Sequence, residues 1–94
     1  MEIADVVKEI VRFMRLDKTL TAKSVIEVGI TPVVVFADRA KLKTVLLNLI
    51  RNALEAVQGK TEGRVTVSNR IEKSDVFVSV EDNGKGISEE NLKG

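Results

Sequence analysis

Residues 38–57, DRAKLKTVLLNLIRNALEAV, decide the fold that the sequence predicts. Apolar side chains recur there at steps of three and four residues, so at about 100° per residue they form one broad stripe on a helix. The members of the stripe are Leu42, Val45, Leu46, Leu49, Ile50, Ala53, Ala56 and Val57. Asp38 can cap the first turn, and Gly59 is a suitable stop just past the last turn. The stretch therefore predicts one long amphipathic helix with a single face in a core.

Two asparagines, Asn48 and Asn52, lie four residues apart at the edge of this stripe. Asparagine is roughly 0.5 kcal/mol worse than alanine in a helix, so two of them among good helix formers carry a cost. Two asparagines alone are more often buried, hydrogen-bonded polar groups than a ligand site. A functional interpretation needs a second motif elsewhere in the chain.

The rest of the chain alternates between helical and strand-like patterns. The predicted helices and strands cover residues 2–15, 24–28, 33–37, 38–57, 64–71 and 76–81. Residues 18–23 form a polar connection, and a turn around Gly29 and Pro32 separates the first two strands. The last two strands form an antiparallel hairpin with one face on the helices. The residues predicted on that face are Val65, Val67, Ile71, Val76, Val78 and Val80. The order indicates a single domain over residues 1–94 in the α+β class, a two-layer α/β sandwich with helices on one face of a mixed or antiparallel sheet.

The second motif follows the last predicted strand, at residues 81–87, EDNGKGI. Asp82 stands at the strand exit, and Gly84 and Gly86 permit positive φ and close approach of a ligand to the backbone. The motif lacks the GK[ST] of a Walker loop, the third glycine of a dinucleotide fingerprint and the spaced acids of an EF-hand. Ser88, followed by two glutamates, resembles the capped start of another helix.

Composition excludes several functions. The 94 residues carry a formal net charge of +1 and only three aromatic residues, all Phe, which argues against nucleic acid and direct membrane contact. Without cysteine there are no disulfides, which fits a cytoplasmic setting, and without histidine there is no imidazole base or phospho-acceptor. No apolar run approaches the ~20 residues that a membrane span needs.

Together the two motifs resemble a known family. Residues 48–56, NLIRNALEA, resemble the N box of sensor histidine kinases, and residues 82–87, DNGKGI, resemble their first glycine box. Phe36-Ala37-Asp38 and residues 42–46 also resemble the usual approach to the N box. Both motifs occur in the wider superfamily of gyrase, heat-shock chaperone, MutL and histidine kinase ATPases. The resemblance implies the N-terminal half of an ATP-binding catalytic domain, ending before the ATP lid.

That resemblance also implies roles for individual residues, with ATP and Mg²⁺ as cofactors. Asn52 would hold Mg²⁺, Asn48 would lie beside the phosphates and Asp82 would accept a hydrogen bond from the adenine amine. The two glycines, Gly84 and Gly86, would shape the pocket, and Ile87 would complete the nucleotide-binding set. No catalytic residue is expected, because an amide at position 48 cannot serve as the general base that gyrase-like members have there. The parent protein, which can be membrane-anchored, would pass phosphate to a histidine on its dimerisation domain and then to a response regulator.

Some features depart from this picture. Many histidine kinases have Lys where this chain has Glu55, which implies a different branch of the family. The missing lid implies weak nucleotide binding and no kinase activity for this stretch alone. An exposed sheet edge and apolar patch would favour dimerisation. The alternative is a non-catalytic interaction module with the same fold; a serine kinase of the anti-sigma type is disfavoured, because those proteins resemble the Glu-containing N box.

Overall fold

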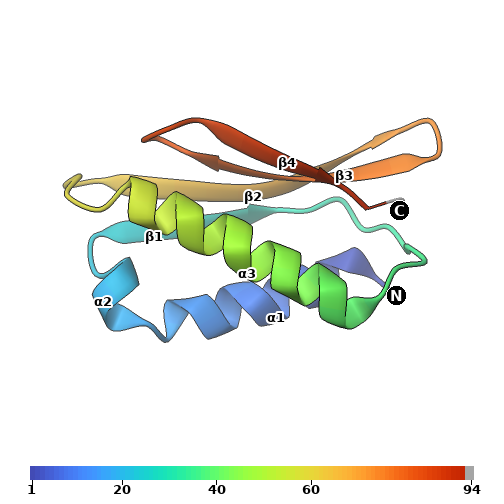
Figure 1. Ribbon diagram of the computed structural model, residues 1–94, viewed down its shortest axis with the longest axis horizontal. Helices are drawn as coiled ribbons and strands as arrows, with labels where there is room; N and C mark the ends of the chain where they lie inside the picture. The colour runs from blue at the N-terminus through green and yellow to red at the C-terminus, as the bar shows by residue number, and fades with distance from the viewer. Residues whose placement is uncertain (93–94) are drawn as a thin grey trace.

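The computed structural model describes residues 1–92 (Figure 1). Its helices and strands, in chain order, are α1 Ile3–Arg15, α2 Lys18–Thr21, β1 Ser24–Gly29, α3 Arg39–Ala56, β2 Gly63–Glu72, β3 Asp75–Asp82 and β4 Ile87–Asn91.

Helix α3 lies close to its predicted bounds. The Asp38 carboxylate accepts hydrogen bonds from the backbone N–H groups of Ala40, at 2.9 Å, and Lys41, at 3.3 Å, so it caps the helix as expected. Gly59 follows the helix with φ +89°, a conformation that glycine adopts without a steric penalty. The buried face includes Leu46, Ile50 and Leu54, each with no exposed surface. These residues pack helix α3 into the hydrophobic core.

The sheet has the strand order β1-β2-β3-β4. Strand β1 pairs with β2 in parallel, and α3 provides the crossover connection that such a pairing requires. The other two pairings are antiparallel. In the β2–β3 hairpin Val67 lies opposite Val80, and both are buried together with Val65 and Val78. The predicted hairpin and its core-facing valines are confirmed.

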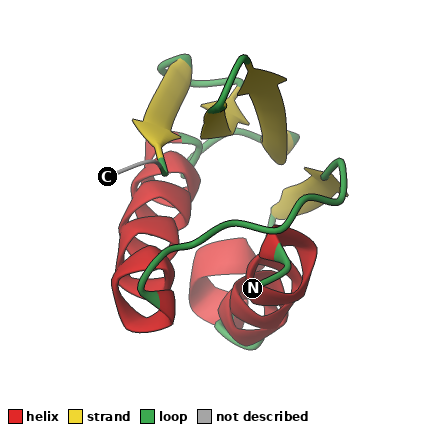
Figure 2. Ribbon diagram, turned by 90° about the vertical axis from the view of Figure 1, so that its right-hand side faces the viewer, coloured by secondary structure: helices red, strands yellow, loops and turns green. Residues whose placement is uncertain are grey.

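The molecule has two layers, with the helices packed on one side of the sheet (Figure 2). The core between the layers combines the buried faces of α1 and α3 with those of the strands. The opposite face of the sheet carries polar side chains: Arg70 on β2 donates to Glu89 on β4 at 2.7 Å and lies 4.1 Å from the ring centre of Phe77. The predicted α+β class, with helices on one face of a mixed sheet, is confirmed.

The strand predicted over residues 33–37 is wrong. Only an isolated bridge forms there, between Val34 and Glu2. The backbone N–H of Val35 donates to the carbonyl of Met1 at 2.8 Å, and that of Ile3 donates to the carbonyl of Val33 at 3.0 Å. The segment pairs with the start of the chain instead of a sheet strand, because the connection from β1 to α3 runs past the N-terminus of α1.

The helix predicted to begin at Ser88 is also wrong, because these residues form β4. The edge of β3 offers unpaired backbone groups, and β4 uses them in the antiparallel register that sets Glu89 opposite Ser79. The Glu89 carboxylate accepts from the Ser79 hydroxyl at 2.9 Å and from Arg70. These long-range contacts outweigh a local capping signal, as tertiary context commonly does.

Two smaller expectations also need correction. The polar connection at residues 18–23 contains the one-turn helix α2, capped by Asp17, whose carboxylate accepts from the Leu20 N–H at 3.0 Å. Ile71, predicted to share the buried face of β2, is 51% exposed. Ile71 alternates in phase with Val65 and Val67, as predicted. It is exposed because it lies near the hairpin turn, in the part of β2 whose residues 70–72 are all exposed.

Candidate functional site

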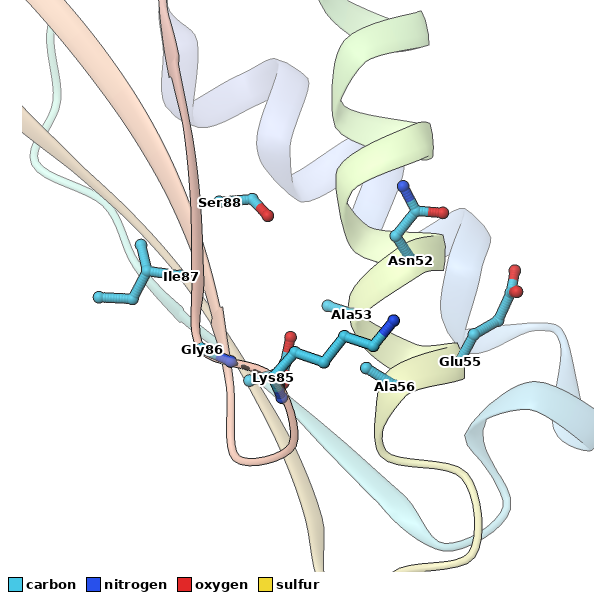
Figure 3. A pocket seen from close by; sticks show the side chains of 9 residues that line it. Asn52, Ala53, Glu55, Ala56, Lys85, Gly86, Ile87 and Ser88 are labelled. Atoms are coloured by element: carbon cyan, nitrogen blue, oxygen red, sulfur yellow. Dashed lines mark hydrogen bonds between the residues drawn. The ribbon is translucent and has the colours of Figure 1, made fainter.

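A cavity of about 460 Å³ lies between the C-terminal half of α3 and the loop joining β3 to β4 (Figure 3). Its volume falls in the usual range for small-molecule sites, about 300–1,000 Å³. Helix α3 contributes Asn52, Ala53, Glu55 and Ala56, the second motif contributes Asp82, Lys85, Gly86 and Ile87, and Ser88 follows directly after the motif. Two stretches separated by a hairpin in the sequence thus form one site.

Asp82 organises the loop on one side of this cavity. Its Oδ1 atom accepts hydrogen bonds from three backbone N–H groups, those of Gly84 at 2.8 Å, Lys85 at 2.5 Å and Gly86 at 3.4 Å. The backbone N–H of Asp82 donates to the carbonyl of Gly86 at 2.8 Å and closes the loop. Asp and Asn side chains favour this kind of turn because they can bond to nearby backbone amides. The hydrogen bonds shown for this carboxylate within residues 1–92 all use Oδ1, so Oδ2 remains available to a ligand.

Gly84 and Gly86 are each required in the loop for a different structural reason. Gly86 has φ +126°, which L side chains rarely adopt. Gly84 lies against the end of α3, where a Cβ atom would stand 2.6 Å from the carbonyl oxygen of Ala56. Gly84 therefore allows the loop to approach the helix closely, and Gly86 allows the chain to turn into β4.

Asn83 anchors the same loop to β2, a role that the sequence analysis missed. Its Oδ1 accepts from the backbone N–H of Arg64 at 2.9 Å, and its Nδ2 donates to the carbonyl of Glu62 at 2.8 Å. The backbone N–H of Asn83 also donates to the carbonyl of Arg64 at 3.2 Å. Asn83 thus extends the hydrogen-bond pairing between β2 and β3 by one position past the end of β3. The signal in the sequence that could have revealed this role is the tendency of asparagine in a turn to form hydrogen bonds with nearby backbone groups.

The structure brings together some of the predicted site residues. Asn52, Asp82, Gly86 and Ile87 border the cavity, whereas Asn48 and Gly84 do not belong to its lining. Asn48 is exposed on the preceding turn of α3. The side chain of Ile87 points away from α3 (Figure 3) and is 65% exposed, so it borders the cavity without facing into it.

Among the lining residues that were not predicted as site residues, three are polar: Glu55, Lys85 and Ser88. Lys85 extends from the loop toward α3, where Asn52 and Glu55 lie about one turn apart (Figure 3). Lys85 and Ser88 could have been found from the sequence, because they lie within or directly after the glycine motif.

The lining fits a hard cation only in company with an anionic ligand. Amide and carboxylate oxygens, such as those of Asn52 and Glu55, are ligands that Mg²⁺ accepts, and it usually takes only one or two of them from the protein. No cluster of three or more acidic, His or Cys side chains suited to a metal occurs within residues 1–92. A magnesium ion at this cavity would therefore draw its other ligands from water and from bound phosphate.

None of the helices in the described part of the chain is long and apolar enough to cross a membrane.

Known proteins share both the sequence and the fold. The adaptive-response sensory kinase SasA of Prochlorococcus marinus is 45% identical over 56 residues, which is 60% of this chain and 14% of that protein. Sporulation kinase C of Bacillus subtilis is 39% identical over 56 residues, which is 60% of this chain and 13% of that protein. The chain thus spans less than a sixth of the length of these curated relatives.

Among solved structures, the histidine kinase AdeS of Acinetobacter baumannii aligns with a TM-score of 0.75 and 27% identity, over 94% of this chain and 43% of that one. The catalytic domain of histidine kinase ThkA aligns with a TM-score of 0.72 and 26% identity, over 89% of this chain and 58% of that one. The sequence profile of the family described as histidine kinase-, DNA gyrase B- and HSP90-like ATPases matches residues 37–94. The chain belongs to this family and matches the catalytic domains of two-component sensor histidine kinases in sequence and fold.

Proposed function

We propose that this chain is the ATP- and Mg²⁺-binding part of a sensor histidine kinase, which supplies the phosphoryl donor for a histidine on another domain. One observation carries the proposal: Asn52 and Asp82, each from a different motif, border the same cavity of about 460 Å³. Family membership supports the same function. The chain itself has no histidine, so the acceptor belongs to another domain or polypeptide.

Asp82 is the residue that we assign to the base. Its Oδ1 atom is engaged by the loop amides, so the loop holds the carboxylate at the cavity in a defined position. A carboxylate only accepts hydrogen bonds, and adenine offers an amino group at the six position, whereas guanine presents a carbonyl there. Two facing acceptors would leave buried polar groups unpaired, at roughly 1–3 kcal/mol. Asp82 would therefore favour adenine over guanine.

Asn52 is the residue that we assign to magnesium. When bound, Mg²⁺ neutralises the phosphate charge that phosphoryl transfer redistributes. The chain contributes positioning: Asn52 offers an amide oxygen from a rigid helix, and the loop orients Asp82. Asn48 cannot activate water, because an amide accepts no proton near neutral pH. This set of residues suits transfer to an external nucleophile better than hydrolysis.

Nucleotide titration of the ¹⁵N-labelled chain tests the proposal. We expect Mg-ATP to shift the amide signals of the cavity residues and GTP to bind more weakly. Asp82→Asn should narrow the difference between ATP and GTP, because the amide can rotate to donate to the guanine carbonyl while keeping an oxygen for the loop. Asn52→Ala should weaken the Mg²⁺-dependent part of binding without changing base preference.

Two results would contradict these assignments. If Asp82→Asn leaves the ATP/GTP ratio unchanged, Asp82 does not read the base. If no nucleotide shifts any cavity residue at millimolar concentration, the chain is better described as an interaction module that keeps the fold without binding nucleotide.

A further inference from the structure

The cavity carries an unusual charge balance for a site that would accept a polyphosphate. Its ionisable lining residues are Glu55, Asp82 and Lys85, which give two carboxylates against one ammonium. Lys85 reaches toward α3 from the loop, and Glu55 projects from the last turn of α3 (Figure 3). The lining thus has a formal charge of −1, the opposite of what would attract a bare anion.

The charges of Glu55 and Lys85 are not satisfied elsewhere in the described structure. The ion pairs within residues 1–92 join Glu9 to Arg39 and Lys43, Glu27 to Arg64, and Arg70 to Glu72 and Glu89. Neither Glu55 nor Lys85 takes part in any of these pairs, and both are exposed. A ligand entering the cavity would therefore meet both charges directly.

We infer that Glu55 makes the cavity select a magnesium-bound polyphosphate over the metal-free anion, and that Lys85 receives the phosphate oxygens. The inference rests on the proposed function and assigns two further residues to that site. Metal-free ATP would bring several negative charges to a cavity whose lining has a formal charge of −1. Bound magnesium removes part of that charge and presents a cation to Glu55 and Asn52, both of which offer oxygen atoms.

The sign of the charge at position 55 would thus decide whether nucleotide binding depends on metal. Glu55 lies in the last turn of α3, where a carboxylate is disfavoured by the helix dipole and a lysine is favoured. Replacing it with lysine is therefore compatible with the fold. The substitution reverses the lining charge from −1 to +1 and removes the reason for metal dependence.

The test compares ATP binding with excess Mg²⁺ and with EDTA, by NMR titration of the 94-residue chain. Adenosine serves as the uncharged ligand. We expect the unchanged chain to prefer Mg-ATP over metal-free ATP by about tenfold or more, and Glu55→Lys to reduce this ratio by about tenfold, chiefly by strengthening metal-free ATP. Glu55→Gln should lie between the two.

Two further variants complete the design. Asp5→Lys makes the same change of charge on α1, at an exposed position outside the cavity, and should leave the ratio unchanged. Lys85→Met should weaken both forms of ATP while leaving adenosine almost unaffected, and Lys85→Arg should restore most of the loss. Thermal melts of each variant confirm that it is folded.

The outcomes separate this inference from the proposed function. If Glu55→Lys changes the ratio no more than Asp5→Lys does, or if the unchanged chain binds both forms of ATP equally, the role of Glu55 is refuted while nucleotide binding stands. If Lys85→Met affects adenosine as strongly as ATP, the role of Lys85 is refuted. If the unchanged chain binds neither ATP nor adenosine, the proposed function fails, and this inference fails with it.

Discussion

Gly84 provides a direct test of how the glycine loop meets helix α3. In Gly84→Ala the new Cβ atom would stand 2.6 Å from the carbonyl oxygen of Ala56, whereas ordinary contact begins at 3.4 Å. The same atom would lie 3.2 Å from Oδ1 of Asp82. Both neighbours are fixed, the first by the helix backbone and the second by its bonds to the loop amides. The loop must therefore move away from α3 by about 0.8 Å, the difference between these contact distances.

The cost of this movement follows from overpacking. Inserting a methyl group into a filled space typically costs about 1–3 kcal/mol. A chain of this size has a free energy of unfolding of about 5–14 kcal/mol, so the loss is a substantial fraction. For a domain of this length, about 2 kcal/mol lowers Tm by roughly 8–16 °C. Gly84→Ala should melt lower by this amount and should also weaken nucleotide binding, because the loop forms one wall of the cavity.

Gly29→Ala is the matched control. A Cβ atom at Gly29 would meet nothing within 4 Å, and its backbone is not in the left-handed region. Its Tm should change by no more than about 3 °C, as for surface substitutions within ±0.5 kcal/mol. Melts followed by far-UV circular dichroism suit a chain without Trp or Tyr. If Gly84→Ala melts like Gly29→Ala, the close approach of the loop to α3 is refuted.

Three other predictions concern different parts of the molecule. Asn83→Ala should speed hydrogen exchange at the backbone N–H of Arg64, because that group loses its bond to the side chain; unchanged exchange would mean that Asn83 does not anchor the loop. The pKa of Glu9 is held below its ordinary value of 4.5, first by the hydrogen bond from Lys43. The ion pair thus stabilises the fold above the unfolded pKa, and this contribution is lost as pH falls through the folded pKa; a carboxyl NMR titration should show a higher Glu9 midpoint in Lys43→Met. Phe36 is fully exposed, and exposed apolar side chains favour self-association. Phe36→Ser should therefore reduce self-association measured by light scattering. An original chain that is monomeric at high concentration would contradict this prediction.

Much of the fold was predictable because local and global preferences agree. The stripe predicted for α3 has helical spacing, and Leu42, Leu46, Ile50, Ala53 and Val57 from it are buried in the core, so periodicity alone located the helix. Val45, Leu49 and Ala56 are only half-buried, and Leu54, which was not predicted to belong to the stripe, is buried. The alternating valines of β2 and β3 likewise determined which faces are buried. Asp38, as a capping residue, marked the start of α3 to within one position.

The site was predictable only in part. Asn52 and Asp82 stood out because each is costly or unusual in its local pattern, and the family resemblance linked them. Lys85 and Glu55 look like ordinary exposed charges in the sequence. Their position at one cavity depends on how the loop packs against the last turns of α3.

The sequence by itself determined the elements whose stability comes from their own pattern: helices α1 and α3, the β2–β3 hairpin and the glycine loop. Tertiary structure decided the conformation of the segments whose backbone groups have more than one possible hydrogen-bond partner. Residues 33–37 carry a strand-like pattern but pair with the start of the chain, and residues 87–91 carry a helix-start signal but pair with the edge of β3. In both cases long-range hydrogen bonds supply more stabilisation than the weak local preference, and a short segment cannot show from its own residues which partner will be near.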